Sequence, residues 1–465
     1  MADLLAHSPP LPIIIYYGNP EPFDEQGDVE GIRLALQHRE RVCRINLHLP
    51  FPSLRKVFKS MDGPFPALET LQLYCSSYRN ENAMIPTRFE APNLRHLQLS
   101  DFTFFPPLRT NPLTAAICPQ SLVTFSLGEA PPTEHWTPAL FAECLEGMPQ
   151  IRCLKIGYLF PVGGSYFGQA SEEVPTVLLS DLEELHFQGD SDYFEALAAR
   201  ITAPSLKKLS ITFTNISSRP SLEKLARLID ESKILRFKFA RVKFKYNFSI
   251  VMDHSELWTG RGAFELIFDV RSSWRSLDRE NELVSKICDA LDPMLPKVQS
   301  LLLEHAQARD SSKWNTNPER ERVVMWRGLL RRFENVETLR VADRLVDELD
   351  RLLELDAGDK GSVGSLLPQL KTIVWYDPEP DGIDGADGSD DVDGADDSDD
   401  DGADDSDDDG ADGSDDIDLN AGTGINDTNV IKPCKERFKA FVEARTAVFQ
   451  PVEVVRSSKS CLSLD

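Results

Sequence analysis

The stretch Leu94-Arg95-His96-Leu97-Gln98-Leu99 has apolar residues at its first, fourth and sixth positions. The same spacing recurs along the chain, and several copies have a proline one or two residues before the first apolar residue. Close copies begin at Val42, Leu68, Leu94, Leu122, Ile151, Leu182 and Leu206, and looser copies begin at Ile234, Val298, Val336 and Leu370. Self-similarity at intervals of roughly 24 to 38 residues indicates a repeat protein.

Each copy alternates in the manner of a β-strand. In the segment Leu97-Gln98-Leu99-Ser100 the two leucines point to one face, and Gln98 and Ser100 point to the other. A short strand with one apolar face cannot bury that face alone, so the copies must stack side by side around a shared core of leucines.

Between the strand copies lie segments with apolar residues at three- and four-residue spacing, which predicts helices. These segments are 30–42, 137–148, 192–201, 221–232, 281–295, 319–333 and 345–355. Thr137-Pro138 fits an N-cap followed by proline at the first helical position. The order strand, loop, helix, strand predicts a parallel sheet with helices on its outer side.

The pattern resembles the leucine-rich repeat, although Ser76, Phe102 and Ala130 stand where the stricter form has Asn or Cys. We therefore predict an α/β fold, an irregular leucine-rich-repeat-like solenoid with parallel strands inside and helices outside. From about Phe239 to Arg275 the pattern changes, and the segments 242–246 and 264–270 alternate strictly, which predicts strands of less regular repeats.

Charge is concentrated in one segment of the 465-residue chain, whose formal net charge is −26. Residues 377–418 contain 21 Asp and one Glu with no Lys or Arg, so the rest of the chain carries a net charge of only −4. Such a segment is predicted to be disordered. We divide the chain into a solenoid (1–376), a disordered Asp-rich insertion (377–433), the final helix and strand of the last repeat (434–456) and a flexible tail (457–465).

The remaining composition favours a protein in the cytoplasm or nucleus. The eight cysteines are scattered without a C-x-x-C pair, which suits buried reduced thiols. We find neither a secretory leader nor an apolar run long enough to span a membrane, so we expect no membrane association. The near-neutral charge outside the insertion gives no sign of a nucleic-acid partner, although the basic helix around Arg327 leaves a contact with nucleic acid or an acidic tail open.

The polar strand positions form the predicted binding surface, because arc-shaped repeat proteins bind partners on their inner face. The alternative is that these are simply solvated strand residues. The candidate residues are His48, Gln72, Tyr74, Gln98, Ser100, Lys155, His186, Gln188, Ser210, Thr212 and Arg340.

The sequence predicts neither a metal site nor a cofactor. No histidine has a Cys or another His at ligand spacing. Segments 397–408 and 405–410 match part of a calcium loop, but an Asp-rich repeat produces such matches by chance, and weak nonspecific cation binding is the expectation. We find no phosphate-binding loop, nucleophile elbow, H-E-x-x-H motif or dinucleotide fingerprint, so we expect no enzyme activity.

Five stretches resemble the leucine-rich-repeat region of fungal, mostly basidiomycete, F-box proteins. They are ADLLAH (2–7) leading into LPI (11–13), the units FPALETLQL (65–73) and APNLRHLQLS (91–100), LFAECLEGMPQIRCLKI (140–156), and RFKAFVEARTAVFQPVEVV (437–455). In that family an N-terminal F-box recruits the Skp adaptor and a cullin ubiquitin ligase, while the repeats hold the substrate. No F-box-like segment is found here, because residue 1 already lies at the junction that follows the F-box in the family.

Two functional hypotheses follow. The first is a protein-interaction scaffold, the substrate-recognition part of a ubiquitin-ligase receptor that lacks its F-box. The second is a ligase-independent binding protein whose acidic insertion engages basic partners such as histones. Salt separates the two, because binding through the insertion should collapse at moderate ionic strength.

Overall fold

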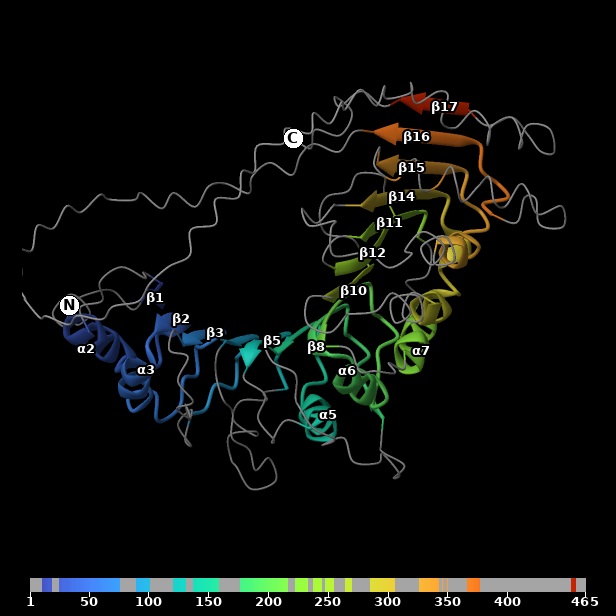
Figure 1. Ribbon diagram of the computed structural model, residues 1–465. Helices are drawn as coiled ribbons and strands as arrows, with labels where there is room; N and C mark the ends of the chain where they lie inside the picture. Colours follow the sequence, from blue (N-terminus) through green and yellow to red (C-terminus); the bar gives the residue numbers. More distant parts are fainter. Residues whose placement is uncertain are drawn as a thin grey trace, which may run out of the picture.

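The structure, a computed structural model of the whole chain, shows an arc with β-strands on its inside and helices on its outside (Figure 1). It describes residues 11–18, 25–75, 89–100, 120–130, 137–158, 176–215, 222–232, 237–244, 247–254, 264–269, 285–305, 326–342, 345, 349, 366–376 and 453–456. The predicted insertion 377–433, the helical part of 434–456 and the tail 457–465 lie outside these residues.

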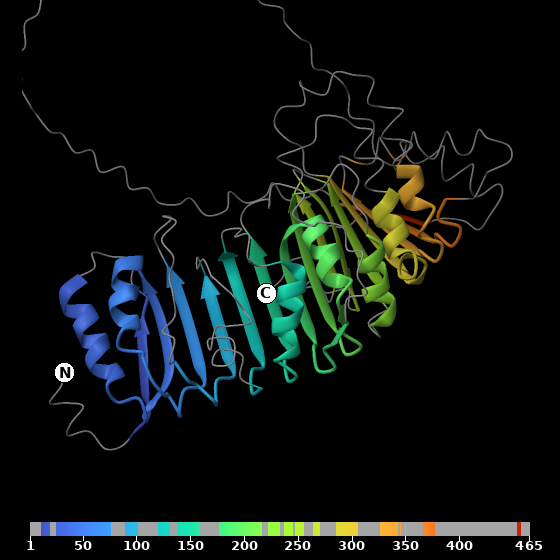
Figure 2. The same cartoon turned by 90° about the horizontal axis from the view of Figure 1, so that it is seen from below.

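A single 15-stranded sheet accounts for nearly all of the described strands, and its first strands stack in chain order (Figure 2). The parallel strands predicted from the repeats are confirmed for β1 to β6, for β8 and β10, and for β14 to β17. The large sheet contains β1 (Ile13–Tyr17), β2 (Val42–Leu49), β3 (Thr70–Cys75), β4 (His96–Ser100), β5 (Thr124–Ala130), β6 (Cys153–Tyr158), β8 (Glu184–Asp190), β10 (Lys208–Asn215), β11 (Phe239–Phe244), β12 (Asn247–Asp253), β13 (Phe264–Asp269), β14 (Ser300–His305), β15 (Thr338–Ala342), β16 (Thr372–Tyr376) and β17 (Glu453–Arg456). A two-stranded ladder joins β7 (Val177–Leu178) to β9 (Ile201–Thr202).

The region after β10 departs from the regular order. Strand β13 lies beside β10, and the chain reaches this place only after passing through β11 and β12, so the sheet order is β10-β13-β12-β11-β14. Strand β12 is antiparallel to both of its neighbours, whereas β11 and β13 remain parallel to the rest of the sheet. The alternation in the sequence predicted β11 and β13. It did not predict β12 or the antiparallel meander, because alternation gives no strand direction.

Several repeats enter their strands through a turn that the proline lead-in favours. In the segment 65–68 the backbone N–H of Leu68 donates to the carbonyl of Phe65 at 3.2 Å, with Pro66 at the second position of the turn. Proline suits that position because its fixed φ matches the turn. The segment 91–94 repeats this arrangement with Leu94 and Ala91 at 3.0 Å.

Polar side chains join successive turns. The Asn93 side chain donates to the carbonyl of Pro66 at 2.8 Å, and the Ser121 hydroxyl donates to the carbonyl of Pro92 at 2.9 Å. Asn335 makes the same contact with the carbonyl of Pro296 at 2.6 Å. These bonds link each turn to the preceding one, so neighbouring repeats are held at the edge of the sheet where the strands begin.

The core lies between the sheet and the helices. The repeat leucines predicted to point inward are buried, with Leu71, Leu97 and Leu99 each at most 2% exposed. Aromatic side chains from strands and helices meet in the same layer, as in the stacked pair Phe125 and Phe141. Burying these apolar surfaces is the main favourable term in folding.

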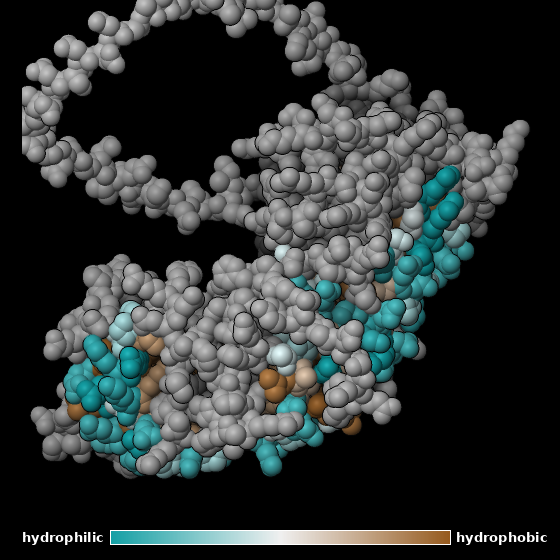
Figure 3. Space-filling model, turned by 60° about the horizontal axis from the view of Figure 1, so that its bottom comes forward, coloured by the Kyte–Doolittle hydropathy of each residue, from teal (hydrophilic) through white to brown (hydrophobic). Residues whose placement is uncertain are grey.

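The described helices cover the outer face of the sheet (Figure 2). On this side the described surface is mostly hydrophilic with small apolar patches (Figure 3). Among the residues that the structure describes, no helix is both long and apolar enough to cross a membrane. The helices are α2 (Glu25–Leu36), α3 (Phe51–Phe58), α5 (Pro138–Glu146), α6 (Ser191–Ala198), α7 (Glu223–Glu231), the 3-10 turn η1 (Leu295–Lys297) and the helical segments 285–291 and 326–330.

Two helices differ from the sequence prediction. Helix α2 ends at Leu36, because a turn and β2 follow where the predicted helix 30–42 continued. Helix α3 was missed, although Phe51, Leu54 and Val57 are buried at helical spacing and Pro50 precedes them. The Thr137 cap is confirmed, since its hydroxyl accepts the backbone N–H of Leu140 at 3.2 Å.

Helices α6 and α7 cap each other. Leu222, at the N-cap of α7, makes no side-chain capping bond, and the buried carboxylate of Glu195 on α6 accepts the N–H groups of Lys224 and Leu225 at 2.9 and 3.0 Å. In return, the Arg227 guanidinium on α7 donates to the carbonyl of Ala198 at the end of α6. Burial raises the pKa of the Glu195 carboxyl above its usual range, although the two backbone N–H groups oppose this effect.

Replacing Glu195 with alanine should lower the free energy of unfolding by about 1–3 kcal/mol, because two backbone N–H groups at the start of α7 lose their acceptor. Urea denaturation of both proteins measures this difference. The matched control is Glu146→Ala, an exposed glutamate on α5, which should change stability by less than about 0.5 kcal/mol. Equal losses in the two variants would contradict the capping role.

Candidate binding surface on the inner strand face

The side of the large sheet opposite the helices, which we call the inner strand face, carries polar residues in register. One row crosses eight neighbouring strands, with one residue from each strand. We call this set the central row, and it consists of Tyr16, Asn46, Gln72, Gln98, Ser126, Lys155, His186 and Ser210. Parallel strands lie about 4.8 Å apart, so side chains in one row touch their neighbours.

All of the predicted binding residues lie on the inner strand face and are exposed or half-buried. Their use by a partner remains a prediction. Five of them belong to the central row: Gln72, Gln98, Lys155, His186 and Ser210. Arg340 on β15 continues the line of this row, because it pairs with Leu302, which pairs with Arg241. The other five lie two residues further along their strands than the central row: His48, Tyr74, Ser100, Gln188 and Thr212.

An amide ladder opens the central row. Asn46 donates its side-chain N–H to Gln72 Oε1 at 2.8 Å, and Gln72 donates to Gln98 Oε1 at 3.1 Å. Amide side chains at the same position of successive repeats can bond in this way because each carries a donor and an acceptor. The ladder fixes the orientation of these three residues before any partner arrives.

An aromatic pair lies beside the ladder. The rings of His48 and Tyr74 are 6.0 Å apart between centroids, and Gln98 makes a side-chain hydrogen bond with Tyr74. Burial raises the pKa of the Tyr74 hydroxyl, which therefore stays protonated and can donate to a partner. A ring with a polar tip on an open face is typical of protein-binding surfaces.

A hollow of about 320 Å³ lies over β2 to β6 on this face. Gly128 leaves space beside the hollow, because it has no side chain. A Cβ atom at this position would lie only 2.6 Å from Ser100 Oγ. The residues lining the hollow are Arg44, Thr70, Gln72, His96, Leu97, Gln98, Thr124, Ser126 and Lys155.

Three titratable side chains meet where β6 and β8 pair. Glu184 lies directly opposite Cys153, and its Oε2 atom is 3.9 Å from Cys153 Sγ and 3.5 Å from His186 Nε2. Burial lowers the pKa of the His186 imidazole, and the nearby ammonium groups of Lys208 and Lys155 lower it further, whereas Glu184 opposes the shift. Burial also raises the pKa of the Cys153 thiol.

Beyond β10, where the chain order of the strands breaks, an ion pair lies on the inner strand face. Arg241 on β11 contacts Glu304 on β14 at 2.6 Å, and both side chains are partly buried. Across the break itself, the Ser210 hydroxyl donates to Glu265 on β13 at 3.1 Å. The face is therefore mainly neutral and polar over β2 to β5 and charged further along.

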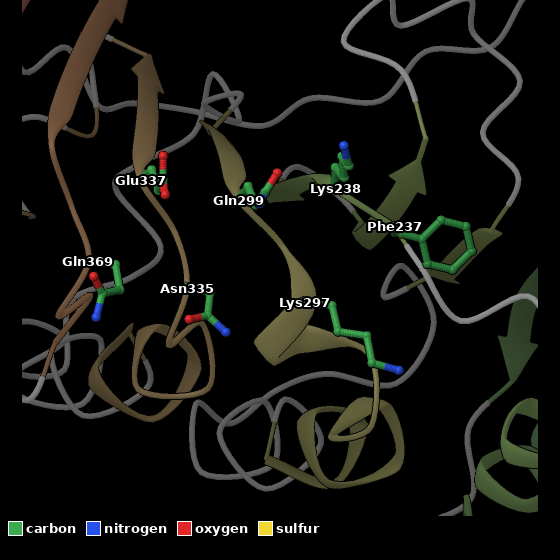
Figure 4. Close-up of a pocket in the computed structure, with 7 residues that line it drawn as sticks. All are labelled: Phe237, Lys238, Lys297, Gln299, Asn335, Glu337 and Gln369. Carbon is green, nitrogen blue, oxygen red and sulfur yellow. The ribbon is translucent and has the colours of Figure 1, made fainter.

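A separate hollow of about 440 Å³ lies at the edge where β11, β14 and β15 begin (Figure 4). Its lining residues belong to the turns rather than to the inner strand face. They are Phe237, Lys238, Lys297, Gln299, Asn335, Glu337 and Gln369. Asn335 and Glu337 already bond to residues of the neighbouring repeats. We therefore interpret this hollow as the gap between successive turns and not as a binding site.

Sequence reasoning missed Asn46, Ser126 and the cluster formed by Cys153 and Glu184 with His186. Asn46 and Ser126 follow the same alternation as Gln98, so the repeat spacing was enough to find them. The copies beginning at Ile151 and Leu182 also place Cys153 and Glu184 at the same repeat position, but the meeting of their side chains is established only by the register of β6 with β8 and the distance of 3.9 Å.

Comparison with known proteins adds little. No protein-family model and no curated protein matches the chain. Among solved structures, the leucine-rich repeat-containing protein LegL7 from Legionella pneumophila is similar at 11% identity, covering 78% of this chain and 89% of that one, with a TM-score of 0.27. The fold assignment therefore rests on strand order and register in this chain.

The pKa of the His186 imidazole should shift in opposite directions when its acidic neighbour Glu184 and its basic neighbour Lys208 are each neutralised. Glu184→Gln should lower it further, because a carboxylate that stabilises the imidazolium is lost, and Lys208→Gln should raise it. Nuclear magnetic resonance titration of labelled histidine measures both shifts, with His186→Gln identifying the signal. Glu304→Gln is the control, since Glu304 lies five strand positions away, roughly 24 Å at about 4.8 Å per strand, where salt screens its charge. Shifts of the same sign in Glu184→Gln and Lys208→Gln would contradict this electrostatic assignment.

Proposed function

We propose that this chain is a leucine-rich-repeat-like scaffold that binds a protein partner on its inner strand face. The observation that carries the proposal is the central row, a line of polar side chains in register, of which the amides from Asn46 to Gln98 are already joined by hydrogen bonds. Side chains held in place before binding lose less conformational entropy when a partner docks.

The surface suits an extended protein segment. Its polar row, the aromatic pair of His48 with Tyr74 and the hollow over β2 to β6 run across the strands rather than into a closed cavity. Tyrosine is enriched at protein interfaces because it combines apolar area with a hydrogen-bonding tip.

The finer proposal is that the partner is a substrate delivered to a ubiquitin ligase through the Skp adaptor and a cullin. Its support is the resemblance of units such as FPALETLQL (65–73) to the repeat region of F-box proteins. In this arrangement the inner strand face selects the substrate and takes no part in catalysis.

A second candidate function is binding of basic proteins, such as histones, through the Asp-rich segment. The observation that favours it is the excess of 22 acidic residues without a basic one in 377–418. Such an excess attracts cationic partners over a range set by ionic strength.

Substituting Tyr74, Gln98 and His186 together with alanine should abolish capture of the partner. Affinity purification of the tagged full-length chain from cells, followed by mass spectrometry and quantitation of the enriched proteins, measures the loss. If the ligase proposal holds, the Skp adaptor and cullin remain in the eluate while the substrate disappears.

The control carries three alanines on the outer face, at Arg55, Glu146 and Asp230, which are exposed on α3, α5 and α7. This variant should keep every partner. Unchanged capture by the inner-face variant, with both variants folded by circular dichroism, would rule out the proposed surface.

Deleting residues 377–418 tests the second candidate function. We expect partners of the inner strand face to bind the shortened chain and to persist at about 1 M salt, where the Debye length is only about 3 Å. Quantitative pull-down at low and high salt measures this. If all capture depends on the segment and vanishes in salt, the acidic segment is the binding element.

A further inference from the structure

We propose that Cys153, Glu184 and His186 form a zinc-binding site on the inner strand face. The three side chains each offer one ligand atom, and these atoms all lie within 4.8 Å of one another. The site does not require the protein partner proposed above, although it lies in the same surface and shares His186 with the residues proposed to contact that partner.

The spacing of the ligand atoms suits one ion. Bond lengths of about 2.0 Å to nitrogen or oxygen and about 2.3 Å to sulfur place tetrahedral ligand atoms roughly 3.3–3.5 Å apart. The distance from Glu184 Oε2 to His186 Nε2 is 3.5 Å, and that from Glu184 Oε2 to Cys153 Sγ is 3.9 Å. The ligand atoms of Cys153 and His186 also lie within 4.8 Å of each other, so rotation of the side chains is needed to bring all three to this spacing.

The backbone holds the ligands in this arrangement. Glu184 and His186 lie two residues apart on β8 and so share a face, and Cys153 is the register partner of Glu184 on β6. Both strands lie inside the sheet, with β5 beside β6 and β10 beside β8. Sites built on paired strands are more precise than sites built on loops.

The donor set selects the metal. A thiolate with an imidazole favours zinc over calcium or magnesium, which prefer all-oxygen sites. With one thiolate and one carboxylate, the two negative charges balance the divalent ion. Lys155 is the register partner of His186, and Lys208 is the register partner of Glu184. Their positive charges disfavour binding of a cation that keeps its charge, but they do not repel this complex, because its net charge is zero.

A fourth coordination position faces the open side of the sheet. The Glu184 and His186 side chains are 45% and 26% exposed, so solvent reaches the point where their ligand atoms meet. Three protein ligands with one open position leave room for water or for a donor atom of a docked molecule. The metal would thus lie within the binding surface, beside Lys155 of the central row.

Cobalt spectroscopy of the full-length chain tests the site. Cobalt(II) replaces zinc in such sites, and ligation by sulfur gives a near-ultraviolet charge-transfer band that carboxylates do not produce. The Asp-rich segment therefore cannot mimic the signal. We expect one equivalent of cobalt to produce the band, stoichiometric zinc to remove it, and calcium in excess to leave it unchanged.

Cys153→Ser should abolish the band, and His186→Gln should weaken cobalt binding and shift the visible bands away from the tetrahedral pattern. The matched control is Cys43→Ser, a half-buried cysteine on β2 outside the cluster, which should retain the full signal. Circular dichroism establishes that each variant is folded. A band that survives Cys153→Ser, or no band in the unaltered chain, overturns the proposal.

Discussion

The register of the parallel strands is the constraint on which the rest of this structure depends. A slip of one residue would turn the buried leucines of a strand toward solvent and its polar residues toward the core. The turns prevent such a slip. The backbone bond that closes each turn, as from Leu68 to Phe65, sets the first residue of the strand, and Asn93 and Ser121 bind the turn before their own. The regular spacing of the sheet and the alignment of its polar rows both follow from these contacts.

The same register produces the chemistry of the inner strand face. Residues that occupy equal positions in successive repeats become neighbours, so the amides of Asn46, Gln72 and Gln98 bond in a line. Cys153 and Glu184 occupy equal positions on β6 and β8, and His186 lies two residues beyond Glu184, so the sheet brings these three titratable residues together. Partner recognition and metal binding, as proposed here, are two uses of one property of stacked strands.

Variation between repeats appears on the outer face, where the backbone N–H and C=O groups at the helix ends need hydrogen-bond partners. Glu195 supplies the N-terminal cap that α7 lacks, and Arg227 donates to the last carbonyl of α6, so two neighbouring repeats stabilise each other through side chains. The meander of β11 to β13 is the other local departure. It introduces one antiparallel strand while preserving the direction of the strands at its borders, so the sheet continues from β10 to β14 without a break.

The sequence by itself determined the repeat spacing, the face of each strand that enters the core and the side on which the polar residues lie, because alternation and apolar spacing are local properties. Asn46 and Ser126 were within its reach for the same reason. Only the tertiary structure decided the position of β13 beside β10, the capping of α7 by Glu195 and the meeting of Cys153 with Glu184. Each of these depends on which strand or helix lies next to which and on which side chains then meet, and the spacing of the apolar residues does not specify those contacts.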